Sequence, residues 1–476
     1  MTLPENEKNQ LFLGTFIHSK KLNELQYLHN TAVCVNTSGK IVAVEPECDQ
    51  TKAETTLYPN LGWTVGNVTV TTGKDGQFFF PGFIDTHLHA PQYPNIGIFG
   101  KSTLLDWLNT YTFPMEASVS SLPKARKVYT RCVRRTLSHG TTTAAYFATI
   151  HVESTNLLAD LCLSMGQRAF IGRVCMDRLG PDYYLDESPE QALAATRANI
   201  AHIRSIDRGF DLVSPIITPR FAPACSTEML RRLGDLHAET RLPVQTHVSE
   251  NVNEVALVRD LFPDSGHYTG VYDQAGLLGD RTILAHAIHL REEEADLIAQ
   301  RGAKVAHCPC SNSALTSGEA RVRWLLEKGI GVGLGTDMSG GYSPSVLEAA
   351  RLACLVSNHL AMPKKQPDEC SQAEREKSKL SVEEALYLAT RGGAEVVGLS
   401  SKVGGFEVGM DWDAQLIGLS MLGEEVTDDY VDDEGNVDIF GWETWENRIA
   451  KWVFNGDDRN TKKVWVRGRL VHERRI

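Results

Sequence analysis

Short apolar runs alternate with longer stretches of helical periodicity from Phe83 onward, and this alternation constrains the possible fold most strongly. Eight such runs lie at residues 83–88, 141–148, 169–175, 212–218, 243–248, 282–287, 303–307 and 330–336. Between them lie helix-like segments, such as 121–138, 189–204, 226–240, 251–262, 291–301 and 319–328. Alternation of this kind is typical of βα units around a parallel sheet, and eight units favour a closed barrel. An open doubly wound sheet is the alternative, but the Gly-rich phosphate loop that would favour it is absent from the sequence.

The two ends of the chain have a different pattern from the middle. Residues 11–75 contain β-branched runs around turn clusters, with no helix of convincing length, and two strand-like runs recur near the C-terminus at 413–417 and 463–471. We therefore predict an α/β protein with a (β/α)8 TIM-type barrel and a small β-sandwich domain formed from both chain ends. The expected division is 1–80 for the N-terminal part of the small domain, 81–395 for the barrel and 396–476 for the C-terminal part.

Three further segments have local signatures. Residues 358–380 are polar and contain two prolines, which indicates an exposed loop or insertion. Ser381 and Glu384 have capping-box spacing and predict a helix that runs to Thr390. Residues 424–434 are acidic and most simply form a solvated loop. Neither the 358–380 segment nor the 420–450 segment carries a chemical motif.

Composition narrows the classes of partner. The formal net charge of −12 argues against nucleic acid or an anionic membrane as the main partner. No apolar run approaches the ~18 residues of a transmembrane helix, and the N-terminus lacks the features of a secretory signal. Ten cysteines are scattered along the chain, and only Cys308 and Cys310 are closely spaced. Free thiols in a reducing cytoplasm are therefore expected.

Candidate metal ligands recur at the ends of the predicted strands. His87 and His89 are two residues apart, so on a strand both point to the same face. His247 and His286 end later strands, Glu250 follows His247, and Asp337 follows the last strand. Each residue alone has an ordinary explanation, such as a packed histidine, an acid at a helix start or a turn cap. A barrel brings its strand ends together, however, so their joint occurrence indicates one site for a zinc-like metal. We take His289 and His307 to be structural.

Several motifs resemble those of the amidohydrolase superfamily: Pro81-Gly82-Phe83-Ile84-Asp85-Thr86-His87-Leu88-His89, His247, His286 and Gly335-Thr336-Asp337. Within it, other positions are similar to the guanine deaminase family: Gln92, Pro219-Arg220-Phe221, Thr246-His247-Val248-Ser249-Glu250 and Gly340-Gly341-Tyr342. The resemblance spans about residues 10 to 470. Binuclear members of the superfamily use a lysine on the fourth barrel strand, and residues 212–218 contain none. One metal ion per chain, expected to be Zn²⁺, is therefore implied.

The resemblance also implies a role for each site residue. It gives His87, His89, His247 and Asp337 as metal ligands. Glu250 is the proton shuttle, while His286 and Asp337 orient the attacking hydroxide. Gln92 and Arg220 are expected to hydrogen-bond the edge of the base, and Phe221 to pack on its face. From position alone, a surface salt bridge is an equally good explanation of Arg220.

The implied activity is the hydrolytic deamination of guanine to xanthine and ammonia in purine metabolism, by an enzyme expected to be a homodimer. Another single-metal deaminase or dechlorinase of the superfamily is the alternative, acting on a pterin, a triazine or an adenosine-derived thioether. The Gln92 and Arg220-Phe221 positions argue against it. A scaffold protein on a catalytically dead fold is a third possibility. Such relatives typically lose metal ligands, whereas this chain keeps all of them.

Overall fold

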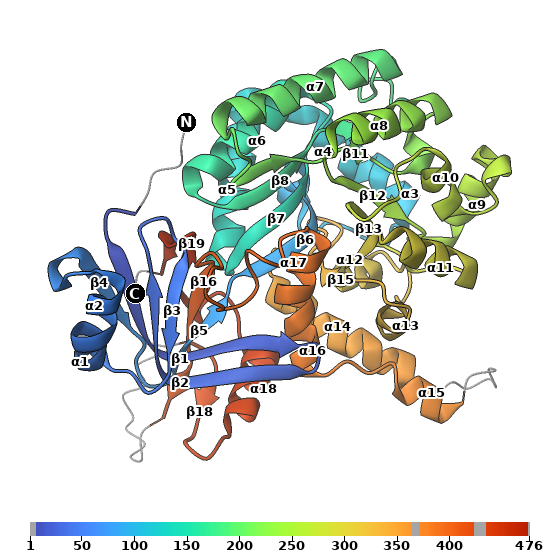
Figure 1. Ribbon diagram of the computed structural model, residues 1–476. Helices are drawn as coiled ribbons and strands as arrows, with labels where there is room; N and C mark the ends of the chain where they lie inside the picture. The colour runs from blue at the N-terminus through green and yellow to red at the C-terminus, as the bar shows by residue number, and fades with distance from the viewer. Residues whose placement is uncertain (1–5, 364–370, 423–434, 475–476) are drawn as a thin grey trace.

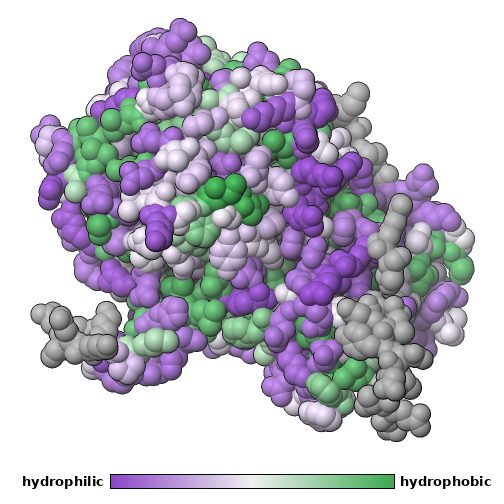
Figure 2. All heavy atoms as spheres, turned by 180° about the vertical axis from the view of Figure 1, so that it is seen from behind, coloured by the Kyte–Doolittle hydropathy of each residue, from purple (hydrophilic) through white to green (hydrophobic). Residues whose placement is uncertain are grey.

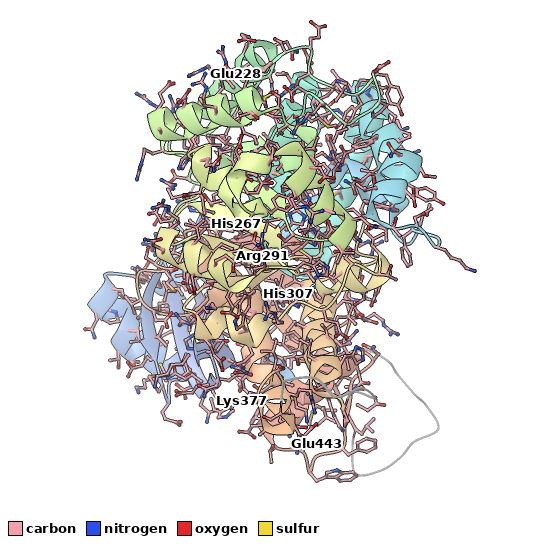
Figure 3. The ribbon with its side chains drawn as sticks, turned by 90° about the vertical axis from the view of Figure 1, so that its right-hand side faces the viewer. Glu228, His267, Arg291, His307, Lys377 and Glu443 are labelled. Carbon is pink, nitrogen blue, oxygen red and sulfur yellow. The ribbon has the colours of Figure 1, made fainter. Side chains whose placement is uncertain are left out.

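The computed structural model describes residues 6–363, 371–422 and 435–474. Barrel helices occupy one part of the molecule, and strands from both chain ends lie side by side in another (Figure 1). Figure 3 shows the same division from the side, with Glu228 of the barrel helix α8 near one end and Glu443, next to the C-terminal helix α18, at the other.

Eight barrel strands were predicted, and each predicted run overlaps one: β6 Phe83–His89, β7 Thr141–Phe147, β8 Arg168–Gly172, β10 Val213–Pro215, β12 Val244–Val248, β13 Thr282–His286, β14 Lys304–His307 and β15 Val332–Leu334. Parallel pairing joins β6, β7, β8 and β10 into one sheet and β12 to β15 into another. A bridge between Ile217 and Val244 links the two sheets on one side. On the other side, Thr86 Oγ1 donates to the Leu334 carbonyl at 2.8 Å, which ties β6 to β15. The strands therefore form a barrel.

Helices follow the strands and cover the outside of the barrel (Figure 1): α5 Leu122–Ser138, α6 Val152–Met165, α7 Pro189–Ile206, α8 Thr227–Thr240, α9 Val252–Leu261, α10 Tyr268–Gln274, α11 Glu292–Arg301, α12 Pro309–Ala314, α13 Val322–Glu327, α14 Val346–Ala361, α16 Val382–Tyr387 and α17 Gly393–Val396. The predicted capping box at Ser381 is present, and the helix that it starts continues through a π-helical turn, η7 Leu388–Gly392. Between β6 and α5, the chain forms four short helical segments: η3 Ala90–Asn95, α3 Leu104–Trp107, η4 Leu108–Thr112 and α4 Phe113–Ser118.

Strands from both chain ends share one eight-stranded sheet, in the order β20-β19-β16-β5-β1-β2-β3, with β4 paired to β1. The N-terminal strands are β1 Asn9–Lys21, β2 Glu24–Val35, β3 Ile41–Glu45, β4 Val68–Thr72 and β5 Gln77–Pro81, and the C-terminal strands are β16 Ala414–Gly418, β19 Thr461–Val466 and β20 Arg469–Glu473. An aromatic cluster holds the two ends together, and in it Phe12 stacks on Trp412 with ring centroids 4.3 Å apart. Because β5 runs directly into β6, the sheet is joined to the barrel at the strand that carries His87 and His89.

Buried charge also ties the sheet to the barrel. Arg168, the first residue of β8, donates to Asp411 at 2.8 Å and to Asp413 at 3.2 Å. All three side chains are almost completely buried. Charges buried in this way must be paired, so this cluster specifies how the C-terminal strands dock on the barrel.

The prediction that residues 11–75 contain no substantial helix was wrong. Residues 50–61 are continuously helical, as α1 Gln50–Lys52, a π-helical turn Ala53–Leu57 and α2 Tyr58–Leu61. Asp49 caps the segment by accepting from the Lys52 backbone N–H at 2.8 Å. Consecutive threonines and a proline weaken the helical signal, but buried Ala53, Leu57 and Tyr58 pack against the sheet.

The two segments without a motif are only partly described. In the first, α14 continues to Ala361 and α15 Gln372–Glu376 follows, while residues 364–370 lie outside the described residues. The whole of the predicted acidic loop, 424–434, also lies outside them. The second segment contains an amphipathic helix that we did not predict, α18 Trp445–Asn455, whose buried face includes Trp452.

The surface has no dominant apolar region on the face in Figure 2, where hydrophobic side chains form small separate groups among hydrophilic ones. Among the described residues, no helix has the length and apolar character that crossing a membrane requires. The nine described cysteines are all free and buried, as the prediction of reduced thiols requires.

Candidate active site

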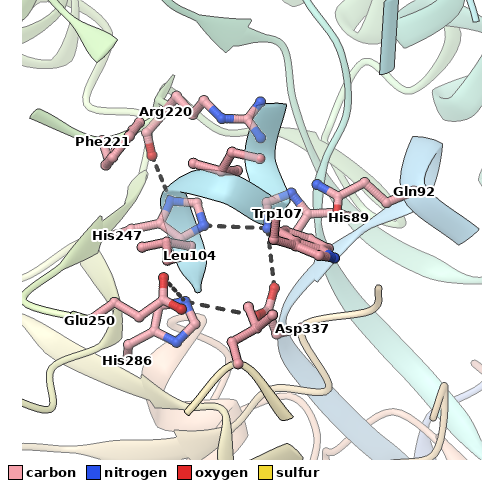
Figure 4. Close-up of a pocket in the computed structure, with 12 residues that line it drawn as sticks. His89, Gln92, Leu104, Trp107, Arg220, Phe221, His247, Glu250, His286 and Asp337 are labelled. Atoms are coloured by element: carbon pink, nitrogen blue, oxygen red, sulfur yellow. Dashed lines mark hydrogen bonds and ion pairs between the residues drawn. The ribbon is translucent and has the colours of Figure 1, made fainter. Parts of the chain in front are cut away.

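The four predicted metal ligands come together at the carboxyl ends of the barrel strands. His87 and His89 lie on β6, His247 lies on β12, and Asp337 follows β15. The Nε2 atoms of His89 and His247 are 3.3 Å apart. Asp337 Oδ1 is 3.2 Å from Nε2 of His87 and 3.2 Å from Nε2 of His89. The four side chains thus lie close together, and Figure 4 shows three of them, His89, His247 and Asp337, facing one another.

The spacing of these atoms fits a tetrahedral metal ion. Metal–nitrogen bonds of about 2.0–2.1 Å place neighbouring ligand atoms of a tetrahedron about 3.3–3.4 Å apart. Three separations, between His89 and His247 and between Asp337 and each of His87 and His89, are 3.2–3.3 Å and agree with this value. A second group that could hold a metal among the described residues, His87, His286 and Cys308, shares His87 with the first, so both belong to one site. The fourth barrel strand, β10, has no lysine that could bridge two metals.

Hydrogen bonding and burial hold the ligands in the forms that bind a metal. His247 Nδ1 donates to the Arg220 carbonyl at 2.6 Å, which leaves the lone pair of Nε2 directed into the site. Burial lowers the pKa of His247 well below its ordinary value and that of His87 to about 4, so both imidazoles are neutral at pH 7. Burial alone would raise the pKa of Asp337, but hydrogen bonds from His87 and His89 hold it well below its usual range.

Glu250 and His286 form a pair beside the ligand cluster. Glu250 Oε2 is 3.4 Å from His286 Nε2, and its other oxygen accepts from Ser317 Oγ at 3.1 Å. Burial raises the pKa of Glu250 to about 7, the range in which a carboxyl group both accepts and donates protons at neutral pH. His286 Nδ1 donates to Asn312 Oδ1 at 2.9 Å, so its Nε2 is directed towards Glu250 and Asp337. Burial would lower the pKa of His286, but these two carboxylates raise it.

The predicted base-binding residues line the same pocket, with Gln92 and Arg220 on one side (Figure 4). A few polar groups in a largely apolar wall are typical of a small-molecule site. Phe221 contributes to the apolar wall. The rest of that wall consists of residues that we did not predict, Leu104, Trp107, Leu108 and Leu315.

Arg220 is not in a surface salt bridge but in a buried one. Its Nη1 and Nη2 donate to the two carboxylate oxygens of Glu116 at 2.5 and 3.2 Å, and both side chains are almost fully buried. Gln92 Nε2 also donates to Glu116, at 2.6 Å. Glu116 lies in α4, between the first strand and the first long helix, and no sequence motif marked it.

A buried charge requires an opposite charge nearby, and the pKa values of Glu116 and Arg220 show this mutual stabilisation. Burial would raise the pKa of Glu116, but Arg220 lowers it, so the carboxylate stays ionised. Burial would lower the pKa of Arg220, and Glu116 raises it. The Glu116–Arg220 pair therefore has no net charge, and the N–H groups of Arg220 that Glu116 does not use remain available to a ligand.

The two histidines that we take to be structural lie outside the ligand cluster. His307, at the end of β14, is buried near the centre of the molecule (Figure 3), and burial lowers its pKa to about 3. His289 Nε2 donates to the Ser317 carbonyl at 2.8 Å and does not line the pocket.

Comparison with known proteins shows the family. The model of the amidohydrolase family matches residues 78–471. A probable guanine deaminase of Schizosaccharomyces pombe is 47% identical over 97% of this chain and 83% of its own length. The guanine deaminase of Homo sapiens is 40% identical over 97% of this chain and 96% of its own length.

Solved structures give the same result. A guanine deaminase from C. acetobutylicum with guanine bound in its active site superposes with a TM-score of 0.83 at 34% identity, covering 98% of this chain and 100% of that one. A triazine hydrolase has a TM-score of 0.77 at 22% identity and shares the fold. The chain belongs to the amidohydrolase family and, within it, to the guanine deaminases.

Proposed function

We propose that the protein hydrolyses guanine to xanthine and ammonia and thereby acts in purine catabolism and salvage. One observation carries the proposal: Arg220 and Gln92, which present hydrogen-bond donors, line the same pocket as the metal-ligand cluster and Glu250. Relatives over nearly the whole chain are guanine deaminases, and one has guanine bound at its active site.

The proposed cofactor is one Zn²⁺ ion per chain, held by His87, His89, His247 and Asp337. Three imidazoles and one carboxylate are a ligand set that zinc accepts, and the spacing of their atoms fits its tetrahedral geometry. Zinc in such a site lowers the pKa of a bound water toward about 7, which supplies a nucleophile at neutral pH.

Glu250 is the proposed proton shuttle. With a pKa of about 7, it can accept a proton from the attacking water and pass it to the ring nitrogen next to the carbon under attack. The same carboxyl group then moves a proton to the departing amine, which leaves as ammonia. The oxygen of water replaces the 2-amino group, and guanine becomes xanthine.

His286 and Asp337 are proposed to orient the attacking oxygen. His286 is fixed by Asn312, and its Nε2 lies 3.8 Å from Asp337 Oδ2 and 3.4 Å from Glu250. The two carboxylates favour its protonated form, so His286 can donate a hydrogen bond to an oxygen that develops negative charge.

Selectivity for the base is proposed to come from Gln92 and Arg220, with Phe221 packing on the face of the ring. An arginine has only donors, so it favours the 6-carbonyl of guanine over the 6-amino group of adenine. A site built to hydrogen-bond one substrate group can reject an analogue that lacks it by up to ~10⁴–10⁵.

We also propose a homodimer, a cytoplasmic location and the domain division at residues 80/81 and 395/396. Buried free cysteines support a reducing compartment. The sheet shared by the two chain ends supports one small domain beside the barrel. The acidic net charge supports a small-molecule substrate in preference to nucleic acid or a membrane.

An ammonia-release assay on metal-loaded protein, with guanine, adenine, cytosine, a pterin and a triazine as substrates, tests the function. We expect turnover of guanine that exceeds that of every other compound by at least ~10³, because adenine lacks the 6-carbonyl and the remaining compounds lack the purine ring system. Faster turnover of the pterin or the triazine than of guanine would overturn the proposal.

A further inference from the structure

Glu116 accepts four hydrogen bonds from three side chains, and two of these, Gln92 and Arg220, line the pocket. Its Oε1 accepts from Gln92 Nε2 at 2.6 Å and from Arg220 Nη2 at 3.2 Å. Its Oε2 accepts from Arg220 Nη1 at 2.5 Å and from the Tyr184 hydroxyl at 2.8 Å. The side chain is fully buried. One carboxylate therefore holds both residues to which we assign recognition of the base.

The contacts decide which hydrogen-bonding groups remain for a ligand. Arg220 has five N–H groups, and two of them are used by Glu116. Gln92 uses one N–H on Glu116, and its carbonyl accepts from Ser339 Oγ at 3.3 Å. The groups left over are mainly donors. A pocket of this kind matches acceptors on a base and disfavours an amino group at the same place.

Glu116 also determines which way the Gln92 amide faces. A carboxylate has only acceptors, so it can pair with the Nε2 side of the amide and not with its oxygen. A glutamine at position 116 could pair with either side, and the Gln92 amide could then turn its carbonyl towards the ligand. The charge on Arg220 would be unpaired at the same time.

Glu116 is fixed in turn by the segment that carries it. Phe113, from the same short helix α4, lies under the Arg220 guanidinium, 5.0 Å from its carbon to the ring centroid. Arg220 is thus held by a carboxylate at its edge and an aromatic ring at its face. Both come from the connection that also supplies Leu104, Trp107 and Leu108 to the pocket.

We propose that Glu116 is a positioning residue that sets base selectivity, by holding Arg220 and Gln92 with their remaining N–H groups towards position 6 of the substrate. The inference rests on the proposed function, because it takes guanine as the substrate. It assigns no contact between Glu116 and the base, since the carboxylate is already saturated by Arg220, Gln92 and Tyr184.

The test compares guanine with 2,6-diaminopurine in the Glu116→Gln variant. The two compounds carry the same 2-amino leaving group and differ at position 6, where one has a carbonyl and the other an amino group, and at the adjoining N1, which carries a hydrogen only in guanine. Hydrolysis of either releases one ammonia and puts oxygen at the same carbon. A purely structural defect lowers kcat/KM for both compounds by the same factor. Loss of positioning lowers the ratio of kcat/KM for guanine to kcat/KM for 2,6-diaminopurine.

We expect guanine kcat/KM to fall about 100-fold in Glu116→Gln and that for 2,6-diaminopurine to fall less than 10-fold, with metal content unchanged. A stranded buried hydrogen-bonding group typically costs ~1–3 kcal/mol, which corresponds to a factor of about 5 to 150. An unchanged ratio would overturn the proposal, whether both values fall together or neither falls.

Asp186→Asn is the matched control. Asp186 is paired with Arg173 in an ion pair that is buried to the same degree, but neither residue lines the pocket. This variant should lose stability as Glu116→Gln does while keeping its substrate ratio. A similar loss of selectivity in Asp186→Asn would show that any broken buried pair has this effect, and the proposal would fail.

Tyr184→Phe provides a milder test if Glu116→Gln does not fold. It removes one hydrogen bond to Glu116 and leaves the charge pair in place. We expect a two- to five-fold fall in the ratio, and no change would overturn the proposal. Parent protein that does not deaminate guanine would refute the proposed function, whereas active parent protein with unaffected ratios would refute only this inference.

Discussion

Replacing Glu250 by glutamine separates metal binding from proton transfer. The new side chain has the same shape, and its carbonyl can still accept from Ser317 Oγ, which donates to Glu250 at 3.1 Å. An amide cannot carry a proton from water to the base. Removing a general acid/base commonly lowers the rate by ~10²–10⁴, which is about 3–5 kcal/mol of barrier.

The structure predicts a second loss in the same direction. Apart from burial, which lowers it, the largest influence on the pKa of His286 is the charge of Glu250, 3.4 Å away, which raises it. Without that charge, His286 becomes less protonated at pH 7 and donates more weakly to the attacking oxygen. We therefore expect the loss of turnover to lie in the upper part of the range, at least ~10³-fold.

The assay is ammonia release at low and at saturating guanine, with metal analysis of the same preparations. We expect kcat and kcat/KM to fall equally and metal to stay near one equivalent, because the interaction lost is made in the transition state. Ser317→Ala, which removes only the hydrogen bond, should stay within tenfold of the parent. Loss of metal from Glu250→Gln would show that Glu250 is a ligand, and turnover within tenfold of the parent would refute its role as the shuttle.

Three further predictions follow from the geometry. Zinc added to chelator-treated protein should restore full activity near one equivalent per chain, and a requirement for two would contradict the single site. In metal-free protein, the pKa of Glu250 is about 7 in the folded state and about 4.3 in the unfolded state, so the free energy of unfolding of the parent falls as pH rises between these values. In chemical unfolding, Glu250→Gln should be about 3 kcal/mol more stable than the parent at pH 8 and equally stable at pH 4. Arg168→Met should cost ~3–5 kcal/mol, because Asp413 then remains buried without its cation and Asp411 keeps only Lys40. The exposed pair of Arg197 provides the control, where Arg197→Met should cost under ~1 kcal/mol.

The barrel was predictable because its strands are buried on both sides. Strand residues of this kind form apolar runs, such as residues 144–148, and several of these strands end at or just before a histidine or an acidic residue at the active-site end. His87, His89 and His247 stood out for the same reason, since a polar side chain at the end of an apolar run needs an explanation. Each histidine alone has an ordinary explanation, and the site was predicted because a barrel brings these strand ends together.

Prediction failed where tertiary packing outweighs local preference. Residues 50–61 contain adjacent threonines and a proline, which favour other conformations, yet Ala53, Leu57 and Tyr58 bury an apolar face against the sheet and stabilise the helix. The helix α18 was missed because it follows an acidic segment that carries no motif.

Glu116 shows a different limit. Placing Arg220 in a closed pocket already requires a counter-charge, because a buried guanidinium without a carboxylate costs several kcal/mol. The sequence therefore contained the requirement for an acid near Arg220. It could not identify the acid, since Glu116 is 104 residues away in a short helix where an acidic side chain is usually exposed. The role proposed for Glu116 depends on its contact with Arg220. That contact forms only when the connection between β6 and α5 folds over the end of the barrel, so the local sequence does not show it.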